Sequence, residues 1–184
     1  MNRPRKYAAM STRELLVCAA LGTLGAVVLA PSIWAFAVLG VAVPVLYPLL
    51  AGVSTCAPTI TQMILRRPGV ALVTCLTMAF ATLPVSPNGA AGLQSLAIVG
   101  LALELPFALG GYRRWGAWRW YVASGLLGLF TVTATWVTLD LGSLRPALAY
   151  AICATTVGSY LTWTAIGRAF GHRLQAAGVG VIAA

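Results

Sequence analysis

The residues able to do acid–base or metal chemistry are few and lie far apart along the chain. The sequence of 184 residues holds three acidic residues, Glu14, Glu104 and Asp140, and one histidine, His172. Acid–base catalysis needs two such groups within reach of one substrate, and metal sites need clustered ligands. The four cysteines also lack the paired spacing of metal ligands. We therefore predict that this chain is not an enzyme and holds no metal.

The composition indicates a membrane protein. Hydrophobic residues make up 60% of the chain, charged residues only 8%, and the mean hydropathy is +0.89. A helix needs about 20 apolar residues to cross a hydrocarbon core, so this length suits about six crossings joined by short loops. The long apolar runs do not alternate as the strands of a membrane barrel do. We expect an all-α integral membrane protein, a bundle of six transmembrane helices.

Proline, glycine and asparagine divide the apolar sequence into segments. The predicted helices cover about residues 12–30, a second segment that ends at residue 65, and then 70–83, 90–111, 121–139 and 146–168. Pro31 is expected to end the first helix, and the prolines of residues 34–65 predict a loop or re-entrant piece before the second. A cleaved signal peptide at the start is the less favoured alternative, because five more apolar segments follow. The predicted organisation is a basic cytoplasmic segment (1–11), a transmembrane domain (12–170) and a cytoplasmic tail (171–184).

The basic residues predict the orientation of the bundle. All but one of the 12 lysines and arginines fall at the same boundary on this map, and only Arg145 lies at the other. Cytoplasmic loops are enriched in lysine and arginine, so both termini are expected in the cytoplasm of a multi-pass plasma-membrane protein. Topology and contact with the anionic lipid bilayer account for the net charge of +9, without a nucleic-acid partner.

Small side chains recur every four residues on the first predicted helix. Cys18, Gly22, Ala26 and Ala30 form one stripe that allows another helix to approach closely. The spacing does not distinguish between a helix of this chain and a partner protein.

Glu104 is the acidic residue expected inside a membrane helix, about 10 Å from the basic boundary. An ionisable group at that depth is costly and is a candidate for function. Two interpretations remain open. Glu104 either pairs with Arg113 or Arg114 or caps a polar contact between helices, or it contacts a ligand or partner.

Polar and aromatic side chains from several segments are expected near the opposite boundary. Aromatic walls with a few amide groups suit a flat, partly polar heterocycle. Tryptophan and tyrosine at this depth are alternatively simple interfacial anchors. The predicted substrate-binding residues, with Glu104 included, are Trp34, Tyr47, Asn88, Gln94, Glu104, Thr133, Trp136 and Tyr150.

Four short segments carry a resemblance to a known family. They are MILRRPGVALVT at residues 63–74, Asn-Gly at 88–89, LELPF at 103–107 and YRRW at 112–115. With these segments the chain resembles the YkoE family, the substrate-binding S components of energy-coupling factor (ECF) vitamin transporters, associated with thiamine or its hydroxymethylpyrimidine precursor. The resemblance extends over most of the chain.

The resemblance implies both an architecture and partners. S components have six helices with both ends in the cytoplasm, and they work with a transmembrane T component and two ATPase subunits that use ATP. The stripe of Cys18, Gly22, Ala26 and Ala30 would then be the surface for the T component. This chain has no phosphate-binding loop with its lysine, so no cofactor is expected on it.

Two positions depart from the family pattern. Cys75 stands where an acidic residue is usual, and Val99 stands near a usual glutamine. These departures favour a less polar or differently charged heterocycle than thiamine. The predicted function is a membrane-embedded substrate-binding subunit of an ATP-driven uptake transporter for a vitamin-like heterocycle, with thiamine and its pyrimidine precursor as candidates. The alternative is a membrane scaffold or interaction protein without transport.

Overall fold

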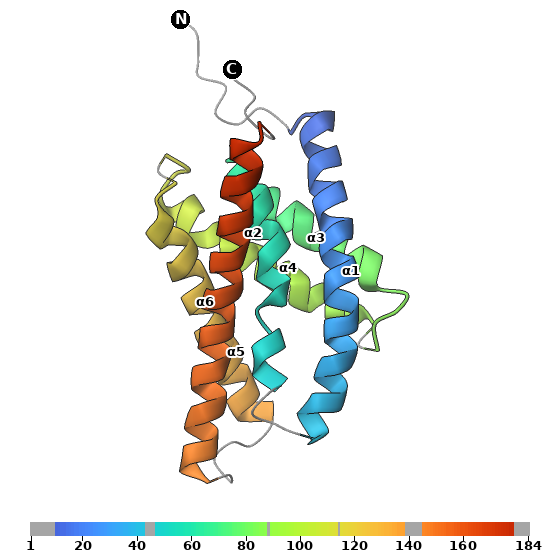
Figure 1. Cartoon of the computed structure of the whole chain (residues 1–184), viewed down its shortest axis with the longest axis vertical. Coiled ribbons are helices and arrows are strands. Elements are labelled where there is room, and N and C mark those ends of the chain that lie inside the picture. Colours follow the sequence, from blue (N-terminus) through green and yellow to red (C-terminus); the bar gives the residue numbers. More distant parts are fainter. Residues whose placement is uncertain (1–9, 43–46, 88, 114, 139–144, 179–184) are drawn as a thin grey trace, which may run out of the picture.

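The computed structural model describes residues 10–42, 47–87, 89–113, 115–138 and 145–178, and every regular element within them is helical. The all-α class is thereby confirmed (Figure 1). The elements are α1 (Thr12–Ala42), the 3-10 helix η1 (Tyr47–Leu50), α2 (Val53–Leu65), α3 (Val70–Thr82), α4 (Ala90–Leu109), α5 (Ala117–Thr138) and α6 (Pro146–Ala176).

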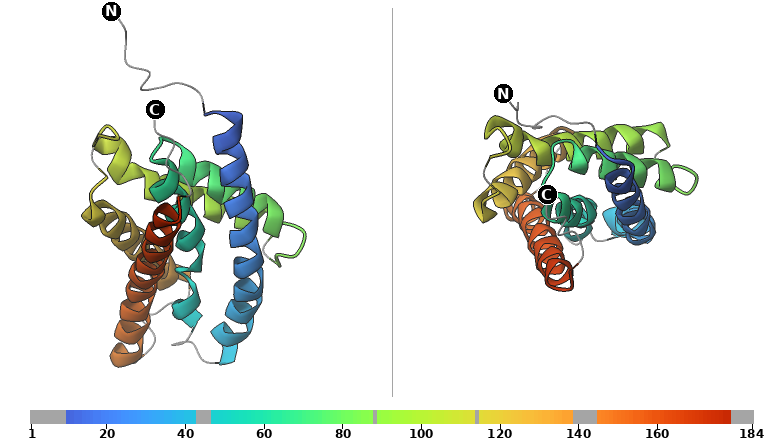
Figure 2. Two further views of the ribbon diagram at one scale, coloured as in Figure 1. Left: turned by 45° about the horizontal axis from the view of Figure 1, so that its top comes forward. Right: turned by 90° about the horizontal axis from the view of Figure 1, so that it is seen from above.

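Helix α2 is the centre of the bundle. It packs against α1, α3, α4 and α6, while α1, α3, α4, α5 and α6 follow one another around it (Figure 2). Ten of its 13 residues are buried, as expected for a helix enclosed on several sides. The start of α1 and the end of α6 lie at the same end of the molecule, at the top of Figure 1.

Within the described residues, four stretches are long and apolar enough to cross a membrane: Thr12–Ala35, Pro48–Leu65, Ala90–Leu109 and Ala117–Val137. The chain is therefore a multi-pass membrane protein. Helix α3 is apolar but has only 13 residues, about 20 Å of helix. Helix α6 has 31 residues but is less apolar than the other α-helices.

The predicted end of the first helix at Pro31 is wrong, because α1 continues through Pro31 to Ala42. Proline removes one backbone donor, but membrane helices accept it where nearby hydroxyls and helices satisfy the freed groups. Ser32 Oγ donates to the Val28 carbonyl at 3.0 Å on that turn. The predicted loop from residue 34 is consequently also helical as far as residue 42.

The remaining boundaries agree more closely with the sequence. Helices α3, α4 and α5 lie where the turn signals placed them, within a few residues. Helix α6 extends to Ala176, about two turns beyond the expected end at Arg168. Arginine is a good helix former, so a charge at the membrane boundary does not itself end a helix.

Candidate functional site

A cavity of about 230 Å³ opens at the end of the bundle opposite the start of α1. We call it the pocket, and this end of the molecule the pocket end. Five α-helices, η1 and the α3–α4 connection contribute to its wall. The lining residues are Leu29, Ser32, Ile33, Leu50, Ala51, Ser54, Ser86, Gly92, Ser95, Leu96, Val99, Thr131 and Tyr160.

The polar groups of the pocket are hydroxyls. Ser32, Ser54 and Ser95 donate to carbonyls of their own helical turns at 2.9 to 3.2 Å, so their remaining capacity is as acceptors. Thr131 Oγ1 lies 3.1 Å from the Tyr160 hydroxyl, which joins α5 to α6. None of the lining residues in the described part of the chain is charged. A charged ligand would lose its hydration there without gaining an opposite charge, so the pocket suits a neutral ligand.

Helix α6 holds η1 in place beside the pocket. Ser159 Oγ donates to the Leu49 carbonyl at 2.7 Å and accepts from the Gly52 N–H at 3.0 Å. Trp163 Nε1 donates to the same carbonyl at 3.1 Å. The adjacent residues Leu50 and Ala51 are thereby fixed in the pocket wall.

The predicted substrate-binding residues near this end lie outside the pocket lining. Trp34 Nε1 donates to the Val85 carbonyl at 3.0 Å and so joins α1 to the α3–α4 connection, next to Ile33 in the wall. Gln94 and Thr133 are exposed. Trp136 and Tyr150 are 44% and 71% exposed, which fits interfacial anchors.

For two more of the predicted substrate-binding residues, the structure does not describe the side chain. Asn88 lies outside the described residues, and Tyr47 is described only as the first residue of η1. A role in binding for any of the predicted residues remains a prediction. Sequence reasoning missed Thr131, Tyr160 and the serines, which look like ordinary helix residues until the helices are assembled.

The two departures from the YkoE pattern lie in the region where α3 packs against α4. Val99 is a lining residue, and Cys75 is fully buried in the same apolar cluster. A methyl group placed on Gly100, beside Val99, would lie 3.1 Å from Cys75 Cβ, which shows how closely α3 and α4 approach. Of the two, Val99 makes the pocket lining apolar near the position where the YkoE pattern has a glutamine, and Cys75 is not a lining residue.

The opposite end of the molecule carries the described arginines other than Arg145. We call it the basic end, defined by Arg13, Arg66, Arg67, Arg113, Arg119, Arg168 and Arg173. Arg145 instead occupies the position just before the start of α6, next to the pocket end.

Glu104 links three parts of the basic end. Its Oε1 accepts from the Ala71 N–H and its Oε2 from the Tyr112 hydroxyl, both at 2.8 Å, and the side chain is buried. A carboxylate at the first turn of α3 satisfies a backbone donor that the helix cannot, and it favours the helix dipole. Of the two interpretations, the cap between helices is the one that the structure contains. Burial and the carboxylate raise the pKa of Tyr112 above its usual range.

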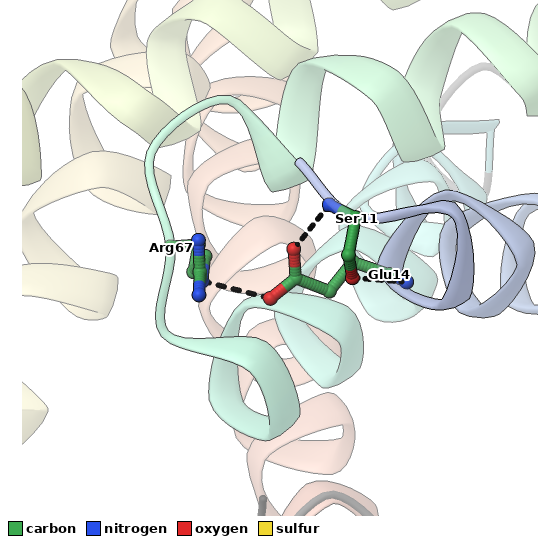
Figure 3. A network of polar contacts seen from close by, with 3 residues as sticks. All are labelled: Ser11, Glu14 and Arg67. Carbon is green, nitrogen blue, oxygen red and sulfur yellow. Dashed lines mark hydrogen bonds and ion pairs between the residues drawn. The ribbon is translucent and has the colours of Figure 1, made fainter. Parts of the chain in front are cut away.

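Glu14 forms a second buried carboxylate contact that sequence reasoning missed (Figure 3). Its Oε2 accepts from the Ser11 N–H at 2.8 Å, and its own N–H donates to Ser11 Oγ at 3.3 Å, a capping box at the start of α1. Its Oε1 lies 2.7 Å from Arg67 Nε. The Ser-x-x-Glu pattern could have indicated the capping box, but Arg67 is distant in sequence.

The connection between α2 and α3 is thus held from both sides. Glu14 binds Arg67 within it, and Glu104 binds Ala71 just after it. Arg66 and Gly69 have left-handed backbone angles, φ 46° and 83°, which turn the chain sharply. Two buried acidic residues therefore secure the Arg-Arg-Pro-Gly connection to α1 and α4.

The stripe of small residues on α1 faces α3. Cys18, Gly22 and Ala26 are buried, and a methyl group on Gly22 would overlap Thr77 Oγ1. Packing within the chain is therefore one use of this stripe, as small-residue faces allow. Contact with a partner protein stays a prediction, and Ala30 is the member with surface left for it.

Comparisons with known proteins agree with this architecture. Residues 13–131 match the model of the family described as "ABC-type cobalt transport system, permease component". A solved structure titled "Crystal structure of an S-component of ECF transporter" superposes with a TM-score of 0.82 at 18% identity, covering 93% of this chain and 88% of that chain. At this identity the likeness shows a shared fold. No curated protein matches the sequence significantly.

Proposed function

Because the chain belongs to the family of permease components of ABC-type cobalt transport systems, we propose that it is the substrate-binding S component of an ATP-driven ECF-type uptake transporter. The observation that carries the proposal is the pocket, a cavity built by five helices at one end of an S-component fold. A scaffold, the alternative function, would need no such cavity. We also propose that this chain is a member of the YkoE group of S components.

The proposed topology has six crossings with both termini in the cytoplasm of a plasma-membrane protein. The basic end would face the cytoplasm, because arginine is enriched on that side of membranes. The pocket would then open toward the outside, where an uptake system meets its substrate. Helix α3 is short and helix α6 is less apolar than the others. We propose that both cross the membrane because they pack against longer or more apolar neighbours.

The proposed partners are a transmembrane T component and two ATPase subunits, which would bind and hydrolyse ATP. Five helices around one central helix leave little room for two rocking halves, so access would alternate through movement of the whole bundle. The T component is proposed to meet α1, near Ala30 and the exposed side chains Leu24 and Val27.

The proposed substrate is a small neutral heterocycle. Sites for drug-sized ligands occupy about 300–1,000 Å³, and the pocket, at about 230 Å³, is smaller. Thiamine carries a permanent positive charge on its thiazolium ring, whereas its hydroxymethylpyrimidine precursor is neutral. The uncharged lining favours the pyrimidine, whose amino and hydroxymethyl groups could donate to the serine oxygens.

A cobalt ion, named in the family description, suits this pocket less well. Divalent transition metals prefer imidazole, carboxylate or thiolate ligands. The described lining has none of these, and no group of three or more such residues occurs elsewhere in the described ranges.

Binding to the purified, detergent-solubilised chain tests the proposal by calorimetry with hydroxymethylpyrimidine, thiamine and Co²⁺ in turn. We expect the pyrimidine to bind most tightly and Ser95→Trp to abolish binding by filling the pocket. Leu101→Trp, an exposed position on the same helix outside the pocket, is the matched control and should bind as wild type. Tighter binding of thiamine or cobalt would refute the substrate assignment, and no binding of any of the three would favour the scaffold.

A further inference from the structure

Arg168 is held against two aromatic rings at the basic end. Its guanidinium carbon lies 5.5 Å from the ring centroid of Trp120 and 5.1 Å from that of Tyr121. The two rings belong to the first turns of α5, and Arg168 lies near the end of α6. Stacking on aromatic faces fixes the planar guanidinium in one orientation.

Two donors of this group lack an acceptor in the described part of the chain. Arg168 Nε and Trp120 Nε1 are both buried without a hydrogen-bond partner in the described part of the chain, and Trp120 is only 2% exposed. Both atoms are N–H groups, and one belongs to a cation. Buried donors are normally satisfied, so two of them side by side indicate a missing acceptor.

The acidic side chains of the described residues are engaged elsewhere. Glu14 contacts Arg67 and Ser11, and Glu104 contacts Ala71 and Tyr112. Asp140 lies outside the described residues. An anion that balances Arg168 must therefore be sought outside the described chain.

We propose that Arg168, Trp120 and Tyr121 form a binding site for the phosphate of an anionic phospholipid. Arg168 lies about 12 Å before the end of α6, counted as eight residues at 1.5 Å each. Tryptophan and tyrosine mark the headgroup level of a bilayer, so the guanidinium lies where lipid phosphates are found. Guanidinium binds phosphate oxygens through two parallel N–H donors.

The surroundings favour a lipid over a soluble phosphate. Tyr121, Val122 and Trp118 are exposed apolar side chains next to the site, suited to acyl chains and the glycerol region. Arg168 itself is half-buried, so an outside phosphate can reach it.

Native mass spectrometry of the full chain in detergent tests the site. The chain is offered phosphatidylglycerol or phosphatidylcholine with identical acyl chains. We expect one retained phosphatidylglycerol, preferred about fivefold, the worth of one basic residue near an anionic surface. Arg168→Gln should abolish the preference. Arg173→Gln removes the same charge from an exposed position and should keep it.

A second variant guards against a folding defect in Arg168→Gln. Arg168→Lys keeps the positive charge that distinguishes anionic phosphatidylglycerol from zwitterionic phosphatidylcholine, so it should melt as wild type and retain most of the preference that Arg168→Gln loses. Equal effects of the Arg168 and Arg173 variants, or equal retention of the two lipids by wild type, would overturn the proposal. Displacement of the lipid by millimolar inorganic phosphate would identify a soluble-phosphate site and would also overturn it.

Discussion

Different kinds of contact join the helices at the two ends of the molecule. At the pocket end, neutral hydrogen bonds join the elements: Ser159 and Trp163 hold η1, and Trp34 holds the α3–α4 connection. At the basic end, buried carboxylates of Glu14 and Glu104 join α1, α3 and α4. Removing one partner of a buried charged contact costs more than removing one of a neutral hydrogen bond.

This difference suggests a division of labour. Under the proposed function the protein must admit and release its substrate, which would require the pocket end to open at a low cost in free energy. The basic end holds the start of α1 and the α2–α3 connection together while this happens. Hydroxyl groups also leave the pocket without a net charge, so the end with the proposed substrate site is distinct from the end that carries the arginines.

The largest effect is expected from Glu104→Ala. The substitution leaves the Ala71 N–H and the Tyr112 hydroxyl without their acceptor, and hydrogen bonds to charged groups are worth about 1.5–3 kcal/mol each. We expect a loss of about 3–5 kcal/mol in the free energy of unfolding, measured by denaturant titration in detergent. Glu104→Gln retains one acceptor and should lose about half as much. Wild-type stability of the alanine variant would mean that the basic end is not held by its carboxylates.

Tyr112→Phe should have a smaller and pH-dependent effect. It removes one hydrogen bond to a carboxylate, about 1.5–3 kcal/mol at neutral pH. The pKa of Tyr112 is raised in the folded state, so its contribution is complete below the unfolded value of about 10 and is lost as pH rises above it. The stability difference between wild type and Tyr112→Phe should therefore shrink above about pH 10. A difference that stays constant across this range would show that the bond to Glu104 is not what the hydroxyl contributes.

The basic end could be predicted in part from sequence. Glu104 stood out because an ionisable residue in an apolar helix is rare. Its partner could not be foreseen, since Ala71 donates through a backbone N–H, a group that every residue except proline has. The connections rich in glycine and proline correctly predicted the bounds of α3 and α4. Pro31 led to a wrong end for α1, because neighbouring groups satisfy the backbone of the turn that the proline interrupts.

The pocket could not be predicted at the level of residues. Thr131 and Tyr160 are separated by 29 residues, and they meet only through the rotation of α5 against α6. Trp34 and Gln94 were expected to bind substrate because of their residue types. Each lies beside a lining residue, Ile33 and Ser95, yet one residue along a helix turns a side chain by about 100°. Val99 was noted as a departure from the family pattern and is part of the wall.

At the pocket end, Thr131→Val should cost little. It removes a neutral hydrogen bond to Tyr160, worth about 0.5–1.5 kcal/mol, and keeps the shape of the side chain. Both stability and affinity for hydroxymethylpyrimidine should fall modestly, measured by the same denaturant titration and by calorimetry. Thr162→Val, which replaces an exposed hydroxyl on α6 outside the pocket lining, is the control and should change neither. A loss as large as that of Glu104→Ala would remove the contrast between the two ends.

The smallest effect is expected for the coupling between Glu14 and Arg67. The Arg67 side chain is 43% exposed, so solvent weakens its attraction to Glu14, and surface ion pairs contribute about 0.2–1 kcal/mol. A double-mutant cycle with Glu14→Gln and Arg67→Gln should give a coupling energy in that range, falling further at high salt. The single Glu14→Gln change should cost more than the coupling, because it also weakens the cap on Ser11. A coupling well above this range would mean that the ion pair is shielded from water, and that the basic end is held by both of its carboxylates equally.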